Sequence, residues 1–100
     1  MKFTSFKDFY PFYLREHSNM VSRKLHFIGT SFVISLLLLF FFTGKPSIFL
    51  ALPVVGYGFA WVGHFIFEKN RPATFKHPLY SLMGDFRMFW DILTSRIKAF

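Results

Sequence analysis

Two long runs without a charged residue dominate the pattern of apolar and polar positions along the chain. The first run covers Leu25–Phe42, the second covers Ile48–Phe67, and the turn-forming segment Thr43–Ser47 separates them. A helix of about 20 residues is about 30 Å long, which is the thickness of the apolar part of a bilayer. The pattern therefore predicts an antiparallel hairpin of two membrane-spanning helices, at about residues 25–42 and 48–67.

Amphipathic segments precede and follow this hairpin. Apolar residues recur at helical spacing over about residues 3–18 and again over about 79–98, and charged residues lie largely on the other faces. We expect both segments to form helices in the membrane interface. Pro11 is expected to break or kink the first of them, and Ser18 and Asn19 are suited to cap the helix that follows. The predicted fold class is all-α.

The composition also indicates contact with lipid. Hydrophobic residues make up 53% of the chain, and Phe alone accounts for 17 of the 100 residues. A soluble domain of this size has too little interior to bury so much apolar surface. We therefore expect one integral membrane domain, residues 1–100, with the lipid bilayer as a partner. The chain has no cysteine, which excludes disulfides and thiolate metal sites.

The basic residues predict the orientation in the membrane. The net charge is +7; five Lys or Arg residues precede the first run, one lies in the turn and six follow the second run. Because Lys and Arg collect on the cytoplasmic side, both termini are expected in the cytoplasm, at a bacterial inner membrane or, in a eukaryote, at the endoplasmic reticulum. Charges beside apolar runs favour an anionic lipid or amphiphile over nucleic acid, and the sequence leaves a homo-oligomer open.

Four histidines are expected at one end of the hairpin. His26 lies 17 residues before Thr43, and His64 lies 17 residues after Ser47, so both rings are about 25 Å from the turn. His17 precedes the first span at this end, and His77 follows the second. A cluster of imidazoles without cysteine suits iron, zinc or copper, so we predict a metal site formed by these four histidines.

Two residues near the histidines are candidates for a catalytic role. Glu68 follows His64 by four residues on one helical face, and Asn19 is two residues from His17, close enough to orient it. Other interpretations stay open. Each histidine alone could bind lipid headgroups, and His26 and His64 could be the axial ligands of a haem.

The same segments resemble a known family. The stretches His17–Asn19, Arg23–Thr30 and Gly63–Ala73 look like the membrane family of iron-dependent 2-hydroxy fatty acid dioxygenases. The resemblance implies Fe(II), O2 and a 2-hydroxy fatty acid that is oxidised to the acid one carbon shorter, with release of CO2. His17, His26 and His64 match the family histidines and Glu68 its acidic position, whereas His77 has no counterpart.

Such a substrate is an anion, and four basic residues near the membrane surface could bind its carboxylate: Arg23, Lys24, Lys69 and Arg71. The same charges also fit simple membrane topology. A membrane protein without catalytic activity, which binds lipid or a partner through its aromatic helices, is the remaining alternative.

Overall fold

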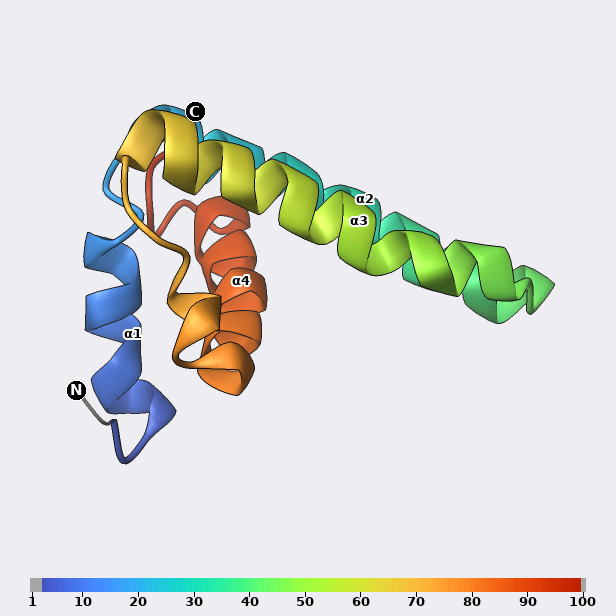
Figure 1. Ribbon diagram of the computed structural model, residues 1–100, viewed down its shortest axis with the longest axis horizontal. Helices are drawn as coiled ribbons and strands as arrows, with labels where there is room; N and C mark the ends of the chain where they lie inside the picture. Colours follow the sequence, from blue (N-terminus) through green and yellow to red (C-terminus); the bar gives the residue numbers. More distant parts are fainter. Residues whose placement is uncertain (1–2, 100) are drawn as a thin grey trace.

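The longest feature of the protein is an antiparallel pair of helices, α2 (Met20–Thr43) and α3 (Pro46–Val62), which projects from one end of the molecule (Figure 1). The computed structural model describes residues 3–99 and has no strand within that range. Asn19 caps α2, as predicted, because its side chain accepts hydrogen bonds from the N–H groups of Val21 and Ser22. The hairpin and the all-α class are confirmed.

The turn of the hairpin is shorter than the sequence pattern predicted. Gly44, with a φ of 65°, ends α2 in the left-handed conformation that glycine adopts without steric cost. Pro46 begins α3 almost at once, since a proline is tolerated in the first turn of a helix. The helices approach closely at Gly29, where an added Cβ would lie 2.7 Å from the Cβ of Phe59.

The far end of the second span differs from the expected α-helix. After Val62 the chain continues as a π-helix, η1 (Gly63–Glu68), which Lys69 ends with a φ of 58°. The Lys69 N–H bonds to the carbonyl of His64. Single π-turns within α-helices are rare and are frequent at functional sites. The apolar pattern could not distinguish this turn from an α-helix.

Two shorter helices, α1 (Phe6–Arg15) and α4 (Pro78–Leu93), pack against each other beside the histidine end of the hairpin (Figure 1). The prediction that Pro11 breaks the first helix is wrong, because α1 continues through it. The chain reaches α4 through a short 3-10 helix, η2 (Ala73–Phe75). The hydrophobic core lies between α1 and α4, and its buried members are Phe9, Tyr13, Met88, Ile92 and Ala99.

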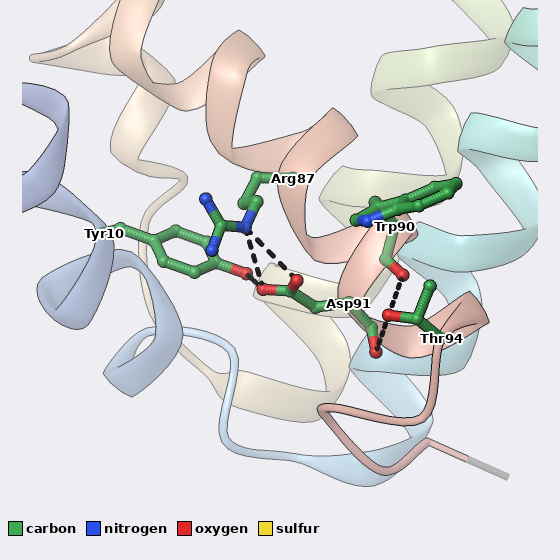
Figure 2. A network of polar contacts seen from close by, with 5 residues as sticks. All are labelled: Tyr10, Arg87, Trp90, Asp91 and Thr94. Carbon is green, nitrogen blue, oxygen red and sulfur yellow. Dashed lines mark hydrogen bonds and ion pairs between the residues drawn. The ribbon is translucent and has the colours of Figure 1, made fainter.

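A polar network also joins α1 to α4 (Figure 2). The Tyr10 hydroxyl donates a hydrogen bond of 2.7 Å to Asp91, which Arg87 contacts at 3.2 Å. The Arg87 guanidinium lies 5.3 Å from the centre of the Tyr10 ring. The buried Asp91 carboxylate is therefore paired, as burial of a charge requires. One turn later, the Thr94 hydroxyl bonds to the carbonyl of Trp90 at 2.8 Å.

The hairpin leaves most of its apolar surface uncovered. Met20–Thr43 and Pro46–Glu68 are long and apolar enough to cross a membrane, and only 11% of each apolar window is buried within the protein. Near the turn, Phe42 is 87% exposed and Leu50 is 70% exposed. A helix in the core of a soluble protein would be mostly buried. This surface is suited to contact with lipid.

Candidate metal centre

Three histidines from different parts of the chain meet in one buried place. His17 lies between α1 and α2, His26 on the second turn of α2, and His64 in η1. The three side chains are at most 4% exposed, and their ligand atoms all lie within 4.8 Å of one another. The centre of the His17 ring is 4.4 Å from each of the other two rings, and His26 and His64 are 5.1 Å apart.

Hydrogen bonds determine the tautomer of two of these rings. His17 Nδ1 lies 2.7 Å from the carbonyl of Tyr13, and His26 Nδ1 lies 2.9 Å from the carbonyl of Ser22. A carbonyl only accepts, so each Nδ1 carries the proton. In the neutral ring, Nε2 is then an unprotonated acceptor. These two Nε2 atoms are 3.0 Å apart.

His64 is oriented in the same way, by a side chain. Its Nδ1 lies 2.6 Å from Oδ1 of Asn70, whose amide nitrogen donates to the carbonyl of Glu16 at 3.1 Å. The second bond determines which way the Asn70 amide points, so its oxygen faces His64 and Nδ1 carries the proton. All three rings therefore use Nδ1 in bonds to the protein. This is the usual arrangement of histidines that bind a metal through the other nitrogen.

The meeting point of the rings suits a cation. Two lone pairs 3.0 Å apart repel each other unless a positive charge lies between them. Burial lowers the pKa of His17 well below its usual value, and the neighbouring His26 and His64 lower it further, so a proton is poorly held there. Neutral imidazoles are good ligands for iron, zinc and copper. The donor set thus fits a divalent metal ion.

Local sequence explains why the rings come so close. Gly63 allows α3 to approach α2, because a Cβ there would lie 2.8 Å from Oγ of Ser22 and 3.4 Å from the His26 ring. His26 and His64 stand at the same level of the hairpin, as their equal spacing from the turn predicts. The π-turn and the left-handed Lys69 then bring Asn70 back to His64.

The other predicted members of the site lie elsewhere. His77 is outside the three-histidine group; its ring packs against the rings of Phe3 and Phe9, 5.2 and 5.5 Å away. Asn19 caps α2 instead of orienting His17. Glu68 accepts a hydrogen bond of 2.6 Å from the Asn19 N–H, so it joins the end of η1 to the start of α2.

The four basic residues do not line the cavity next to the histidines. Arg23 donates from Nε to the carbonyl of His17 at 2.6 Å and reaches the carbonyl of Lys98 at 3.2 Å, which places it in the framework of the site. Lys24 is half-buried on α2, while Lys69 and Arg71 are exposed on the segment after η1.

Tyr13 supports the histidine group from α1 and was missed by the sequence analysis. Its ring stacks on His17 with 4.0 Å between ring centres, and its hydroxyl donates a 2.5 Å hydrogen bond to Asp85. Gly84 makes room for the ring, because a Cβ there would lie 2.7 Å from it. Burial raises the pKa of Asp85 to about 7, although the bond from Tyr13 acts in the opposite direction. The spacing of Tyr13 and His17 by four residues was the available signal.

A cavity of about 350 Å³ opens beside the three histidines. Its polar end is also lined by Tyr13, Asp85 and Ser81, and its apolar end by residues of α2 and α3. The Ser81 hydroxyl is buried without a hydrogen-bond partner in the protein. Such an orphaned group beside a cavity is able to bind a ligand.

Comparison with known proteins identifies the family. Residues 3–97 match the model of the family described as 2-hydroxy-palmitic acid dioxygenase Mpo1-like. The chain belongs to this family. No curated protein and no solved structure matched the chain. The suspected resemblance is thereby confirmed over nearly the whole sequence.

The Mpo1-like family name implies a dioxygenase that acts on a 2-hydroxy fatty acid, and the buried three-histidine group of this member could hold a metal ion. The geometry favours a single ion over a haem. A macrocycle would have to lie between two axial imidazoles, but the His17 ring is within 4.4 Å of both His26 and His64.

Proposed function

We propose that this protein is an Fe(II)-dependent dioxygenase that converts a 2-hydroxy fatty acid to the acid one carbon shorter. One O2 is consumed, and CO2 and water are released, so the substrate itself supplies the electrons and no separate reductant is needed. The observation that carries the proposal is the convergence of the ligand atoms of three buried histidines at the head of a cavity. The family name supports the class of reaction and substrate.

The proposed ligands are His17, His26 and His64, each through Nε2. A ferrous ion held by three neutral imidazoles would retain positive charge and open positions, and it would supply the exchange of electrons with O2. The protein keeps the ring nitrogens in place through the Nδ1 bonds to two carbonyls and to Asn70. Burial of the rings excludes bulk water from the reacting groups.

The substrate head would lie where the cavity is polar. Ser81 can donate its unpaired hydroxyl to the carboxylate or the 2-hydroxyl group of the substrate. Lys69 and Arg71 are exposed near the end of the second span, where they can attract an anion from the cytoplasmic leaflet. We assign them to attraction of the substrate, since they do not line the cavity. Glu68 and Asn19 stabilise the fold around the site.

The proposed location is the membrane itself, with the histidine end of the hairpin at the cytoplasmic surface. The location in the membrane is supported by the two long apolar helices, most of whose surface is not buried within the protein. An amphiphile such as a 2-hydroxy fatty acid would have its carboxylate at the same depth as the histidines.

The test is metal analysis of the detergent-purified protein, followed by anaerobic loading with Fe(II) and measurement of O2 uptake and CO2 release with 2-hydroxyhexadecanoate. We expect one iron per chain and one CO2 for each O2. His64→Ala should lose both iron and turnover, because it removes a ligand from inside the group.

His77→Ala is the matched control, since it removes an imidazole that lies outside the three-histidine group and packs against aromatic rings. It should keep iron and turnover. An iron-replete, active His64→Ala protein would overturn the assignment. A Soret band would favour a haem protein, and the absence of stoichiometric metal would favour a non-catalytic membrane protein.

A further inference from the structure

The cavity continues from the histidines along the hairpin as an apolar groove. From α2 it is lined by His26, Thr30, Val33 and Leu37, which are spaced by four, three and four residues and so share one helical face. From α3 it is lined by residues at the matching levels, among them Ala60, Gly56 and Leu52. Charged and titratable side chains other than Tyr57 lie at the histidine end, Thr30 and Tyr57 add hydroxyl groups farther along, and Leu37 and Leu52 line the far end.

The length of the groove can be compared with that of an acyl chain. His26 and Leu37 are 11 residues apart on α2, which corresponds to about 16 Å along a helix. His64 and Leu52 are 12 residues apart on α3, or about 18 Å. An extended carbon chain, with bonds of about 1.5 Å and angles near 111°, advances about 1.25 Å per carbon. The groove therefore matches a tail of about 13 or 14 carbons beyond the head group.

We propose that this groove holds the saturated tail of the 2-hydroxy fatty acid, and that Leu37 and Leu52 set the longest tail that fits. The inference rests on the proposed function for the identity of the head group. A cavity of about 350 Å³ is at the small end of ligand sites, which suits one tail and not the two tails of a phospholipid. Gly56 leaves the middle of the groove open, because its missing side chain would face Val33 at 3.4 Å.

The first test measures turnover of 2-hydroxy acids from 10 to 20 carbons, in one detergent, by variants that fill the groove. Leu37→Phe and Leu52→Phe should move the preferred substrate to shorter chains. Val33 lies one turn, or about 6 Å, nearer the histidines than Leu37. Val33→Phe should therefore shorten the preferred chain by about five carbons more than Leu37→Phe does. Leu37→Ala should raise the relative rate with the longest acids.

The matched controls carry the same substitution on the outer faces of the two helices. Leu38 and Leu50 are 56% and 70% exposed and do not line the groove, so Leu38→Phe and Leu50→Phe should keep the wild-type order of substrates. The same order in all five Phe variants would overturn the inference, even if every variant is active.

The second test does not depend on turnover. A 2-hydroxyhexadecanoate with a diazirine at its ω carbon is photolysed with the wild-type protein in nanodiscs, and labelled residues are mapped by mass spectrometry. We expect labels near Leu37 and Leu52, and their loss when unlabelled 2-hydroxyhexadecanoate is added. Labels scattered over the outer faces, or competed only by phospholipid, would overturn the inference. Specific labelling without turnover would instead count against the dioxygenase function alone.

Discussion

Two asparagines near the histidine group have different roles, which the structure separates. Asn70 joins His64 to the carbonyl of Glu16, with bonds of 2.6 and 3.1 Å. Asn19 accepts hydrogen bonds from the first N–H groups of α2. One side chain therefore orients a proposed ligand, and the other stabilises a helix. A substitution at each position should change a different measured quantity.

We predict that Asn70→Ala weakens iron binding by about 10- to 100-fold, as expected for loss of the partner that orients a metal-binding histidine. Excess Fe(II) should restore its activity. Asn19→Ala removes a helix cap and should lower the free energy of unfolding by about 1 kcal/mol, while its iron affinity stays near that of the wild type. Iron titration and thermal unfolding of both variants in the same detergent measure the two effects. Equal iron affinity in both variants would contradict the role given to Asn70.

At the scale of the helices, the join between α3 and η1 positions one of the three histidines. Gly63 is buried where α3 meets α2, and His64 follows it as the second residue of the π-turn. The space that a Cβ would need is taken by Oγ of Ser22 and by the His26 ring. By contrast, a Cβ at Gly58, which lies in α3 on the side toward the turn of the hairpin, would meet nothing within 4 Å.

Gly63→Ala is therefore expected to separate the two helices at the level of the histidines. Overpacking of this kind typically costs about 1–3 kcal/mol, and the change in ring positions should also reduce iron binding. Gly58→Ala should be neutral or stabilise the protein by up to about 1 kcal/mol, since alanine favours helix. Unfolding temperature and iron content, measured side by side, test this pair. A Gly63→Ala protein as stable and as rich in iron as Gly58→Ala would refute the packing argument.

In the molecule as a whole, an apolar hairpin projects from a small bundle that contains the hydrophobic core and the histidine end (Figure 1). Within residues 3–99, ten of the eleven Lys and Arg residues lie in or next to this bundle, and Lys45 alone lies in the turn of the hairpin. Such a shape suits a protein whose bundle rests on one membrane surface.

We predict that residue 1 and residue 100 lie on the cytoplasmic side and that Lys45 lies on the other side. Reporter fusions at the termini and a reporter inserted at Lys45 should give opposite signals. A variant with three added lysines in the turn tests the positive-inside rule independently. In this variant a smaller fraction of the protein should have its termini on the cytoplasmic side. Termini on opposite sides would contradict the two-span topology.

Much of the fold could be predicted because it follows from patterns within single segments. The two uncharged runs predicted α2 and α3, and Asn19 was expected as a cap. Equal spacing from the turn predicted that His26 and His64 stand at one level, and their rings are 5.1 Å apart. Pro11 was misjudged because packing against α4 can outweigh the cost of a proline within a helix.

The details of the site depend on contacts between distant segments, which the sequence pattern does not contain. Asn19 was expected beside His17, but the cap it forms is a stronger local use of its side chain. Asn70 became adjacent to His64 only through the π-turn and the left-handed Lys69. His77 was expected in the group because it follows the second span at the same end of the hairpin, yet the aromatic residues of the N-terminal segment pack around its ring.

The three histidines are separated by long stretches of chain, with 9 residues from His17 to His26 and 38 from His26 to His64. An ion bound to all three would therefore act as a removable cross-link, which closes two loops and restricts the unfolded chain. Stability and iron supply would then be coupled by mass action. Each tenfold rise in free Fe(II) concentration above the dissociation constant of the site would add about 1.4 kcal/mol to the free energy of unfolding. A cell short of iron would hold this protein in a looser and more easily degraded form.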